Sequence, residues 1–130
     1  MESTNEVREP YQDEELERVL EETDAVYARG RAESSHALLQ EARRQYGYAV
    51  ACWPLDWRAW IRQIECMAFD CALAMQERFE PIKVRSCLND IAKHKNGAMK
   101  IIKDPEGLAA LEKVVEEASG KLRSLSAERK

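Results

Sequence analysis

Residues 53–79 read WPLDWRAWIRQIECMAFDCALAMQERF, and this stretch decides the fold. Its apolar residues recur at steps of three and four, with no alternation of period two. Plotted at about 100° per residue, they fall on one face, which indicates a helix and not a strand. They are Trp57, Trp60, Ile61, Ile64, Ala68, Cys71, Ala72, Met75 and Phe79. The stretch therefore predicts an all-α fold with a central, Trp-rich helix.

The opposite side of this predicted helix carries a second apolar stripe, formed by Cys66, Phe69 and Leu73. A helix that is apolar nearly all round is usually buried on several sides. The direct interpretation is a core helix. The alternative is that Phe69 and Leu73 form an exposed anchor for another chain, and burying both side chains would contribute roughly 3–5 kcal/mol.

Prolines and an acidic residue set the expected limits of the central helix. Pro54 suits a first helical position, where its missing N–H costs nothing. Asp56 lies close enough to the start to interact favourably with the helix dipole. At the other end, Pro81 disfavours helical geometry in Glu80. A helix from about Trp53 to Phe79 is predicted.

A long first helix is predicted from about Tyr11 to Ala51. Its apolar and small residues keep steps of four and three: Leu16, Leu20, Thr23, Tyr27, Gly30, Ser34 and Ala37. Unbroken, it would be about 60 Å long and would project beyond the shorter central helix. The small residues would let another helix approach closely, or Gly30 could kink or split the helix so that it folds back.

A third helix is expected after Pro81, with one interruption. Its shared face is formed by Val84, Cys87, Leu88, Ile91, Ala98, Met99 and Ile102. Asn96-Gly97 falls within this pattern and predicts a break or bend, with a helix cap after Lys95. A small β-hairpin around Asn96-Gly97 is the alternative.

The last helix has a clear start and a regular seam. Asp104 is a good N-cap, and Pro105 suits the first helical position. Gly120 weakens the middle of this helix by about 1 kcal/mol relative to alanine. The seam follows heptad spacing and consists of Leu108, Leu111, Val115, Ala118, Leu122 and Leu125.

Length and composition fit one small domain. The chain has 130 residues, of which 45% are hydrophobic and 34% are charged, as in helices with solvated outer faces. Residues 1–10 lack an apolar period and are expected to be a flexible acidic N-terminus. Residues 11–127 are expected to form a single helical-bundle domain of about four helices.

The beginning of the chain resembles neither a signal peptide nor a basic transit sequence. Asp70 interrupts the longest apolar run, so no membrane span is expected. The expected location is intracellular and soluble, cytoplasmic or nuclear. The four cysteines are therefore expected to be free thiols.

Charge is segregated along the chain despite a net charge of −4. Residues 1–24 hold ten acids and two arginines, a net −8, whereas residues 81–103 hold six Lys/Arg and one Asp, a net +5. Arg85, Lys93, Lys100 and Lys103 project on one side of the third helix. This basic stripe could contact phosphates, or it could be a solvated face that attracts the acidic first helix.

Metal and catalytic patterns are incomplete. Glu33 and His36 match one Glu-x-x-His element of a di-iron bundle, but a second element is missing. Cys87 and His94 could lie on one side of a helix, yet no Cys-x-x-Cys supports a zinc site. No nucleophile elbow or glycine-rich phosphate loop occurs. We expect no cofactor, no metal and no enzymatic activity.

The leading hypothesis is a small helical protein–protein interaction module, an adaptor, assembly subunit or regulator in a homo- or hetero-oligomer. Its predicted partner-binding residues are Phe69, Leu73, Leu16, Leu20, Leu122 and Leu125. The alternative is a nucleic-acid-binding protein that uses Arg85, Lys93, Lys100 and Lys103. Helical hairpins are superficially similar to tetratricopeptide proteins, but their Trp/Leu/Gly/Tyr repeat is absent, so nothing is carried over from that family.

Overall fold

The computed structural model describes residues 13–128, and only the backbone of residues 126–128. Within this range the chain forms five helices and no strand. They are α1 (Glu14–Glu33), α2 (His36–Cys52), α3 (Trp57–Glu77), α4 (Pro81–Ile101) and α5 (Pro105–Glu128). The all-α prediction is confirmed, with five helices instead of about four. The predicted flexible N-terminus, residues 1–10, lies outside the described residues.

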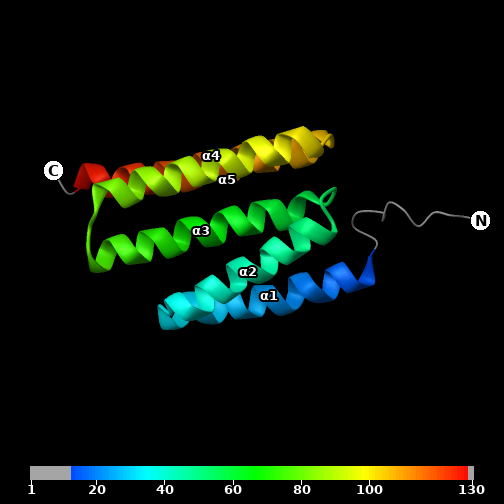
Figure 1. Ribbon diagram of the computed structural model, residues 1–130, viewed down its shortest axis with the longest axis horizontal. Helices are drawn as coiled ribbons and strands as arrows, with labels where there is room; N and C mark the ends of the chain where they lie inside the picture. Colours follow the sequence, from blue (N-terminus) through cyan, green and yellow to red (C-terminus); the bar gives the residue numbers. More distant parts are fainter. Residues whose placement is uncertain (1–12, 129–130) are drawn as a thin grey trace, which may run out of the picture.

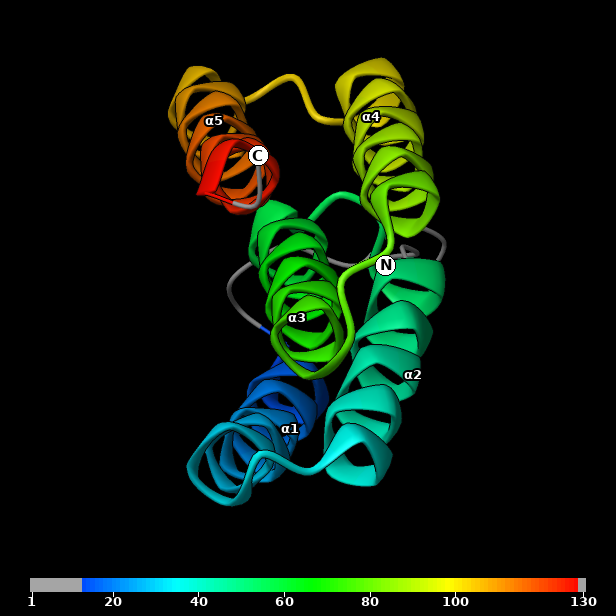
Figure 2. The same ribbon diagram turned by 90° about the vertical axis from the view of Figure 1, so that its left-hand side faces the viewer.

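Helix α3 lies at the centre of the arrangement. It contacts each of the other four helices. The pair α1 and α2 lies on one side of it, and the pair α4 and α5 lies on the other (Figure 1). Viewed end-on, α1 and α5 flank one edge of α3, whereas α2 and α4 flank the other (Figure 2). The predicted central position of this helix is confirmed.

Two hydrophobic clusters explain why α3 lacks a polar face. Ile64 and Met75 of α3 belong to a cluster formed with α4 and α5. Ala59 and Cys66, on other sides of α3, belong to a cluster formed with α1 and α2, which includes the fully buried Tyr46. Because α3 is covered from both sides, apolar residues occupy most of its circumference.

The predicted 40-residue first helix is wrong. The chain turns at Ser34 and Ser35, so α1 and α2 form an antiparallel hairpin. Ser34 has φ 50° and ψ 46°, while the Ser35 N–H donates to the Gly30 carbonyl at 2.9 Å. This is the Schellman ending, which usually has glycine at the left-handed position. Ser35 then caps α2 by accepting from the Leu38 N–H at 3.2 Å.

Gly30 is not the point where the chain folds back. It lies inside α1, where a Cβ atom would be 2.9 Å from Leu39 Cδ2 and 3.1 Å from the Leu39 backbone nitrogen. The first interpretation of the small stripe, close approach of another helix, is therefore confirmed at Gly30. The helix that approaches is α2 of the same hairpin.

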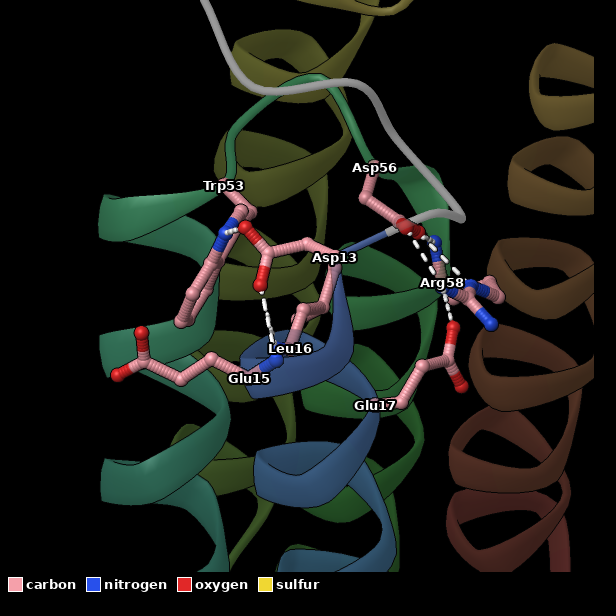
Figure 3. A network of polar contacts seen from close by, with 7 residues as sticks. All are labelled: Asp13, Glu15, Leu16, Glu17, Trp53, Asp56 and Arg58. Carbon is pink, nitrogen blue, oxygen red and sulfur yellow. Dashed lines mark hydrogen bonds and ion pairs between the residues drawn. The ribbon is translucent and has the colours of Figure 1, made fainter. Parts of the chain in front are cut away.

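Polar contacts join the start of α1 to the α2–α3 connection (Figure 3). Asp13 caps α1, and its second carboxylate oxygen accepts from Trp53 Nε1 at 2.9 Å. Asp56, fully buried, caps α3 and pairs with Arg58, which also reaches Glu17 at 2.7 Å. The helix thus starts at Trp57. The prediction that Pro54 occupies the first helical position is wrong, because Pro54 lies in the preceding turn.

Helix α4 continues through Asn96-Gly97, so the predicted break there is wrong, and so is the hairpin alternative. Gly97 faces the Trp60 ring, since a Cβ atom would be 3.7 Å from it, in ordinary contact. By contrast, the predicted N-cap of α5 is confirmed. Asp104 accepts from the Glu106 N–H at 2.9 Å.

Candidate binding surfaces

The apolar seams predicted to bind a partner are mostly used inside the fold. Leu16 and Leu122 have no exposed surface, and Leu20 is 3% exposed. Leu125 is half-buried and packs against the cluster between α3, α4 and α5. A side chain without accessible surface cannot contact a second chain unless the fold opens. Leu16, Leu20 and Leu122 are therefore core residues in this structure.

Phe69 and Leu73 are half-buried on α3. Phe69 lies near Tyr27 of α1, and both residues lie near Leu125 of α5. They line a hollow of about 150 Å³ together with Leu125 and Lys121. Phe69 also borders a neighbouring hollow of about 250 Å³ and makes an edge-to-face contact with Tyr27 at 6.2 Å. Both hollows are smaller than the roughly 300–1,000 Å³ typical of small-molecule sites.

The basic stripe is intact on the exposed face of α4. The side chains of Arg85, Lys93 and Lys100 are exposed, as is that of Lys103 just after the helix. None of the ion pairs found within residues 13–128 involves these four cations. The stripe therefore presents four exposed cations that have no ion-pair partner among residues 13–128.

The basic stripe is a solvated face, as the second interpretation predicted, but it makes no contact with the acidic first helix. Helices α1 and α4 do not contact one another, and α3 lies between their two layers (Figure 1). Two acids of α1 pair with α3 instead: Glu17 pairs with Arg58 at 2.7 Å, and Asp24 pairs with Arg62 at 3.0 Å. Both arginines belong to α3.

Two exposed apolar side chains lie on the same face of α4. Ile82 is 70% exposed and Met99 is 47% exposed. The prediction that Met99 shares the apolar face of Val84 and Ile91 is therefore wrong. At 100° per residue both project within about 60° of the line through Arg85 and Asn96. Single exposed apolar residues are ordinary, but here they border the unpaired cations. The face is therefore both cationic and partly apolar.

A polar cluster joins the start of α2 to the end of α3. His36 Nδ1 lies 2.6 Å from Asp70 Oδ1, and His36 Nε2 lies 3.0 Å from Glu77 Oε1. The hydrogen bond to Asp70 and the weaker one to Glu77 raise the pKa of His36. Both contacts are best made by the imidazolium, which donates from both nitrogens. The cluster is thus a pH-dependent contact between two helices.

This cluster predicts a pH effect on stability. Because the folded-state pKa of His36 lies above its ordinary value of 6.5, its stabilisation is complete below that value and is lost as pH rises through the folded-state pKa. The imidazole is about one third exposed, so the effect will be small. Urea unfolding of wild type and His36→Gln across pH 5.5–9, roughly the range around a histidine pKa, measures it. A wild-type curve parallel to that of the variant contradicts it.

The Glu33 and His36 pair does not form half of a metal centre. Glu33 pairs with Arg29 at 3.4 Å, whereas His36 turns to Asp70 and Glu77. Cys87 and His94 have separate partners: Cys87 Sγ lies 4.0 Å from the Met67 carbonyl oxygen, and His94 Nδ1 lies 3.0 Å from the Asp90 carbonyl oxygen. Among the described residues, no group of three or more His, Cys, Asp or Glu side chains could hold a metal ion.

The sequence reading missed the partners of His36. Asp70 and Glu77 are seven residues apart on α3 and therefore lie on the same side, two turns apart. That spacing is visible in the sequence. Their proximity to His36 depends on how α2 packs against α3. The apolar periodicity of the two helices does not specify that packing.

No helix within residues 13–128 combines the length and apolarity needed to cross a membrane. Comparison with protein-family models, with curated proteins and with solved structures finds no match for this chain.

Proposed function

We propose that this protein is a small helical interaction module whose docking face is the exposed side of α4. The proposed partner is an acidic amphipathic segment of another protein. The observation that carries the proposal is the row of exposed cations, Arg85, Lys93, Lys100 and Lys103, without an ion-pair partner among residues 13–128. Complementary charge speeds encounter and selects partners, even where each exposed pair adds little affinity.

The apolar members of this face favour a protein partner. Ile82 and Met99 are exposed beside the cations, and they gain nothing from phosphate groups. Against an amphipathic helix they would be buried, which contributes about 25 cal/mol per Å² of apolar surface. Helix α4 has 21 residues, so the face is about 30 Å long. That length suits a partner helix of similar size.

The leucine seam of α5 and the Phe69/Leu73 stripe are weaker candidates for the docking surface than the exposed side of α4. The heptad-like seam of α5 packs against α3 and α4 within the chain. Phe69, Leu73 and Leu125 still border a hollow, but its volume of about 150 Å³ is small. They form at most an accessory contact for self-association or for a partner. The exposed side of α4 is longer than this hollow, and it combines positive charge with exposed apolar side chains.

Nucleic acid is the second candidate for the same face. Four exposed cations without an ion-pair partner among residues 13–128 match the requirement for phosphate contacts. The net charge of −4 opposes this assignment, because the acidic α1 face would repel an extended polyanion at low salt. The apolar residues, not the lysines, distinguish the two candidates.

We predict that reversing two charges on the α4 face weakens binding about tenfold or more at low salt. The test titrates the double variant Lys93→Glu/Lys100→Glu with a fluorescent acidic amphipathic peptide of repeated Glu and Leu. The matched control is Lys113→Glu/Arg123→Glu, which makes the same change in net charge on exposed positions of α5. Equal affinities for the two double variants contradict the proposal.

The pair Ile82→Ser/Met99→Ser separates the candidates. Both side chains are exposed, so the fold should tolerate the changes. A protein partner loses affinity with this variant, whereas labelled single-stranded RNA or DNA binds it as it binds wild type. Tight oligonucleotide binding that is sensitive to Lys93→Glu/Lys100→Glu, without peptide binding, would establish the second candidate.

A further inference from the structure

We propose that Cys71 and Cys87 are a redox-active thiol pair that a hydroperoxide converts to a disulfide linking α3 to α4. This inference is independent of the docking face on α4. It assigns a modification site to a groove on the opposite side of that helix.

The helical hairpin places these two residues at the same height. Phe79 lies in the α3–α4 connection, and Cys71 and Cys87 are each eight residues from it. In an antiparallel pair of helices, residues equally far from the turn lie opposite one another. The chain therefore brings one thiol from each helix to one level.

The side chains face the same space. Both border a hollow of about 190 Å³ between α2, α3 and α4, and both are half-buried. Cys87 Sγ lies 4.0 Å from the carbonyl oxygen of Met67, which is one turn before Cys71 on α3. The two thiols share a hydrogen bond.

The surroundings distinguish the two sulfurs chemically. The hydrogen bond from Cys87 lowers the pKa of Cys71, whereas the same contact and burial raise the pKa of Cys87. The hollow is lined by two cations, Arg43 and Lys83, and by two acids, Asp70 and Asp90. Asp70 opposes the lowering of the Cys71 pKa. Since the thiolate is the nucleophile, the proposal gives the first attack to Cys71 and the resolving step to Cys87, and the dimedone labelling below tests this order.

The other cysteines are unsuited to this reaction. Cys66 is fully buried, donates to the Leu39 carbonyl oxygen at 3.1 Å, and has a pKa raised by burial to about 12. Cys52 is exposed at the end of α2 and belongs to neither α3 nor α4. Of the four thiols, those of Cys71 and Cys87 are the pair that shares a groove.

The reaction balances with a hydroperoxide as the two-electron oxidant. The Cys71 thiolate attacks one peroxide oxygen, the O–O bond breaks, and the departing oxyanion takes a proton to become an alcohol or water. Cys71 is then a sulfenic acid. The Cys87 sulfur attacks the Cys71 sulfur, the S–O bond breaks, and the released hydroxide leaves as water with the Cys87 proton. A dithiol reductant restores both thiols by exchange.

The test oxidises the folded, reduced protein with hydrogen peroxide, then denatures it, alkylates the remaining thiols and measures the intact mass. Reduced protein takes up four alkyl groups, one per cysteine, and oxidised monomer is expected to take up two. Cys66 and Cys71 share one tryptic peptide, residues 63–78, so the cross-link to the peptide of residues 86–93 is assigned by fragmentation. Treatment with a dithiol should restore four alkylated sites.

Variants assign the roles. Dimedone, which traps sulfenic acids, should label Cys71 in Cys87→Ser and label neither position in Cys71→Ser. Cys52→Ser is the matched control and should form the disulfide as wild type does. A cross-link through Cys52 or Cys66 overturns the proposal, as does full alkylation of peroxide-treated monomer. The peptide map of wild type decides the question even if Cys71→Ser fails to fold.

Discussion

Replacing Asp56 with alanine is expected to lower the free energy of unfolding by about 3 kcal/mol, the combined effect of a lost helix cap and a broken charge pair. The Asp56 side chain is fully buried, and its Oδ1 accepts from the Arg58 N–H at 3.0 Å. The same carboxylate receives two hydrogen bonds from the Arg58 guanidinium, at 3.0 and 2.7 Å. These bonds, with the contact to Glu17, raise the pKa of Arg58.

The predicted loss of stability has two parts, because Asp56 is both the N-cap of α3 and the ion-pair partner of Arg58. An N-cap replaced by alanine costs about 1 kcal/mol. A charged hydrogen bond contributes about 1.5–3 kcal/mol, and Arg58, with 23% of its side chain exposed, recovers only part of it from water and from Glu17. Removing Asp56 also loosens the attachment of α1 to the start of α3, which Figure 3 shows.

Thermal and urea unfolding followed by circular dichroism measure this effect. Asp56→Asn retains a cap acceptor but lacks the charge, so it should fall between wild type and Asp56→Ala. The matched control is Asp104→Ala, which removes the cap of α5 at a half-buried position and should cost about 1 kcal/mol. If Asp56→Ala is no worse than Asp104→Ala, the pair with Arg58 contributes little.

Gly107→Ala is expected to destabilise the protein by about 1–2 kcal/mol, although alanine is the better helix former. Gly107 is buried in the first turn of α5, against the first residue of α3. An added Cβ would lie 2.5 Å from Trp57 Cδ1, 2.6 Å from Cγ and 3.0 Å from Cβ. These atoms lie close to the Trp57 backbone, at the base of a large, packed side chain. Moving them would cost packing energy.

Gly120 in the same helix is the matched control. No atom lies within 4 Å of the position that its Cβ would occupy, so Gly120→Ala should stabilise the protein by about 1 kcal/mol. The two variants make the same chemical change with opposite expected signs. The urea midpoints of both variants measure these changes in stability. If both variants are stabilised, Gly107 and Trp57 are not in close contact.

Much of the secondary structure follows from local patterns. The period of residues 57–77 and the apolar second stripe identified a helix covered on several sides. Asp104-Pro105 located the start of α5 because capping depends on two or three adjacent residues. The break at Ser34-Ser35 was missed because serine is an unusual occupant of a left-handed helix ending. Asn96-Gly97 predicted a break that does not occur, because α4 stays helical there with Gly97 facing the Trp60 ring.

The candidate sites were predictable to different degrees. That the cations of α4 share one side could be predicted from the period of a single helix, and their exposure agrees with that prediction. Leu16, Leu20 and Leu122 could not be separated from surface seams, because heptad spacing is the same for an intramolecular and an intermolecular contact. The pairing of Cys71 with Cys87 requires knowing that α3 and α4 form an antiparallel hairpin.

By itself the sequence determined the helical class, the central helix, the cap at Asp104 and the basic side of α4. All of these depend on residues within a few turns of one another. Tertiary structure alone decided that α1 folds back on α2, that the leucine seams are internal, and which side chains meet: His36 with Asp70, Asp56 with both Arg58 and α1, and Cys71 with Cys87. The physical reason is that periodicity specifies which face of a helix is apolar, whereas the partner of that face depends on how all the faces are buried together.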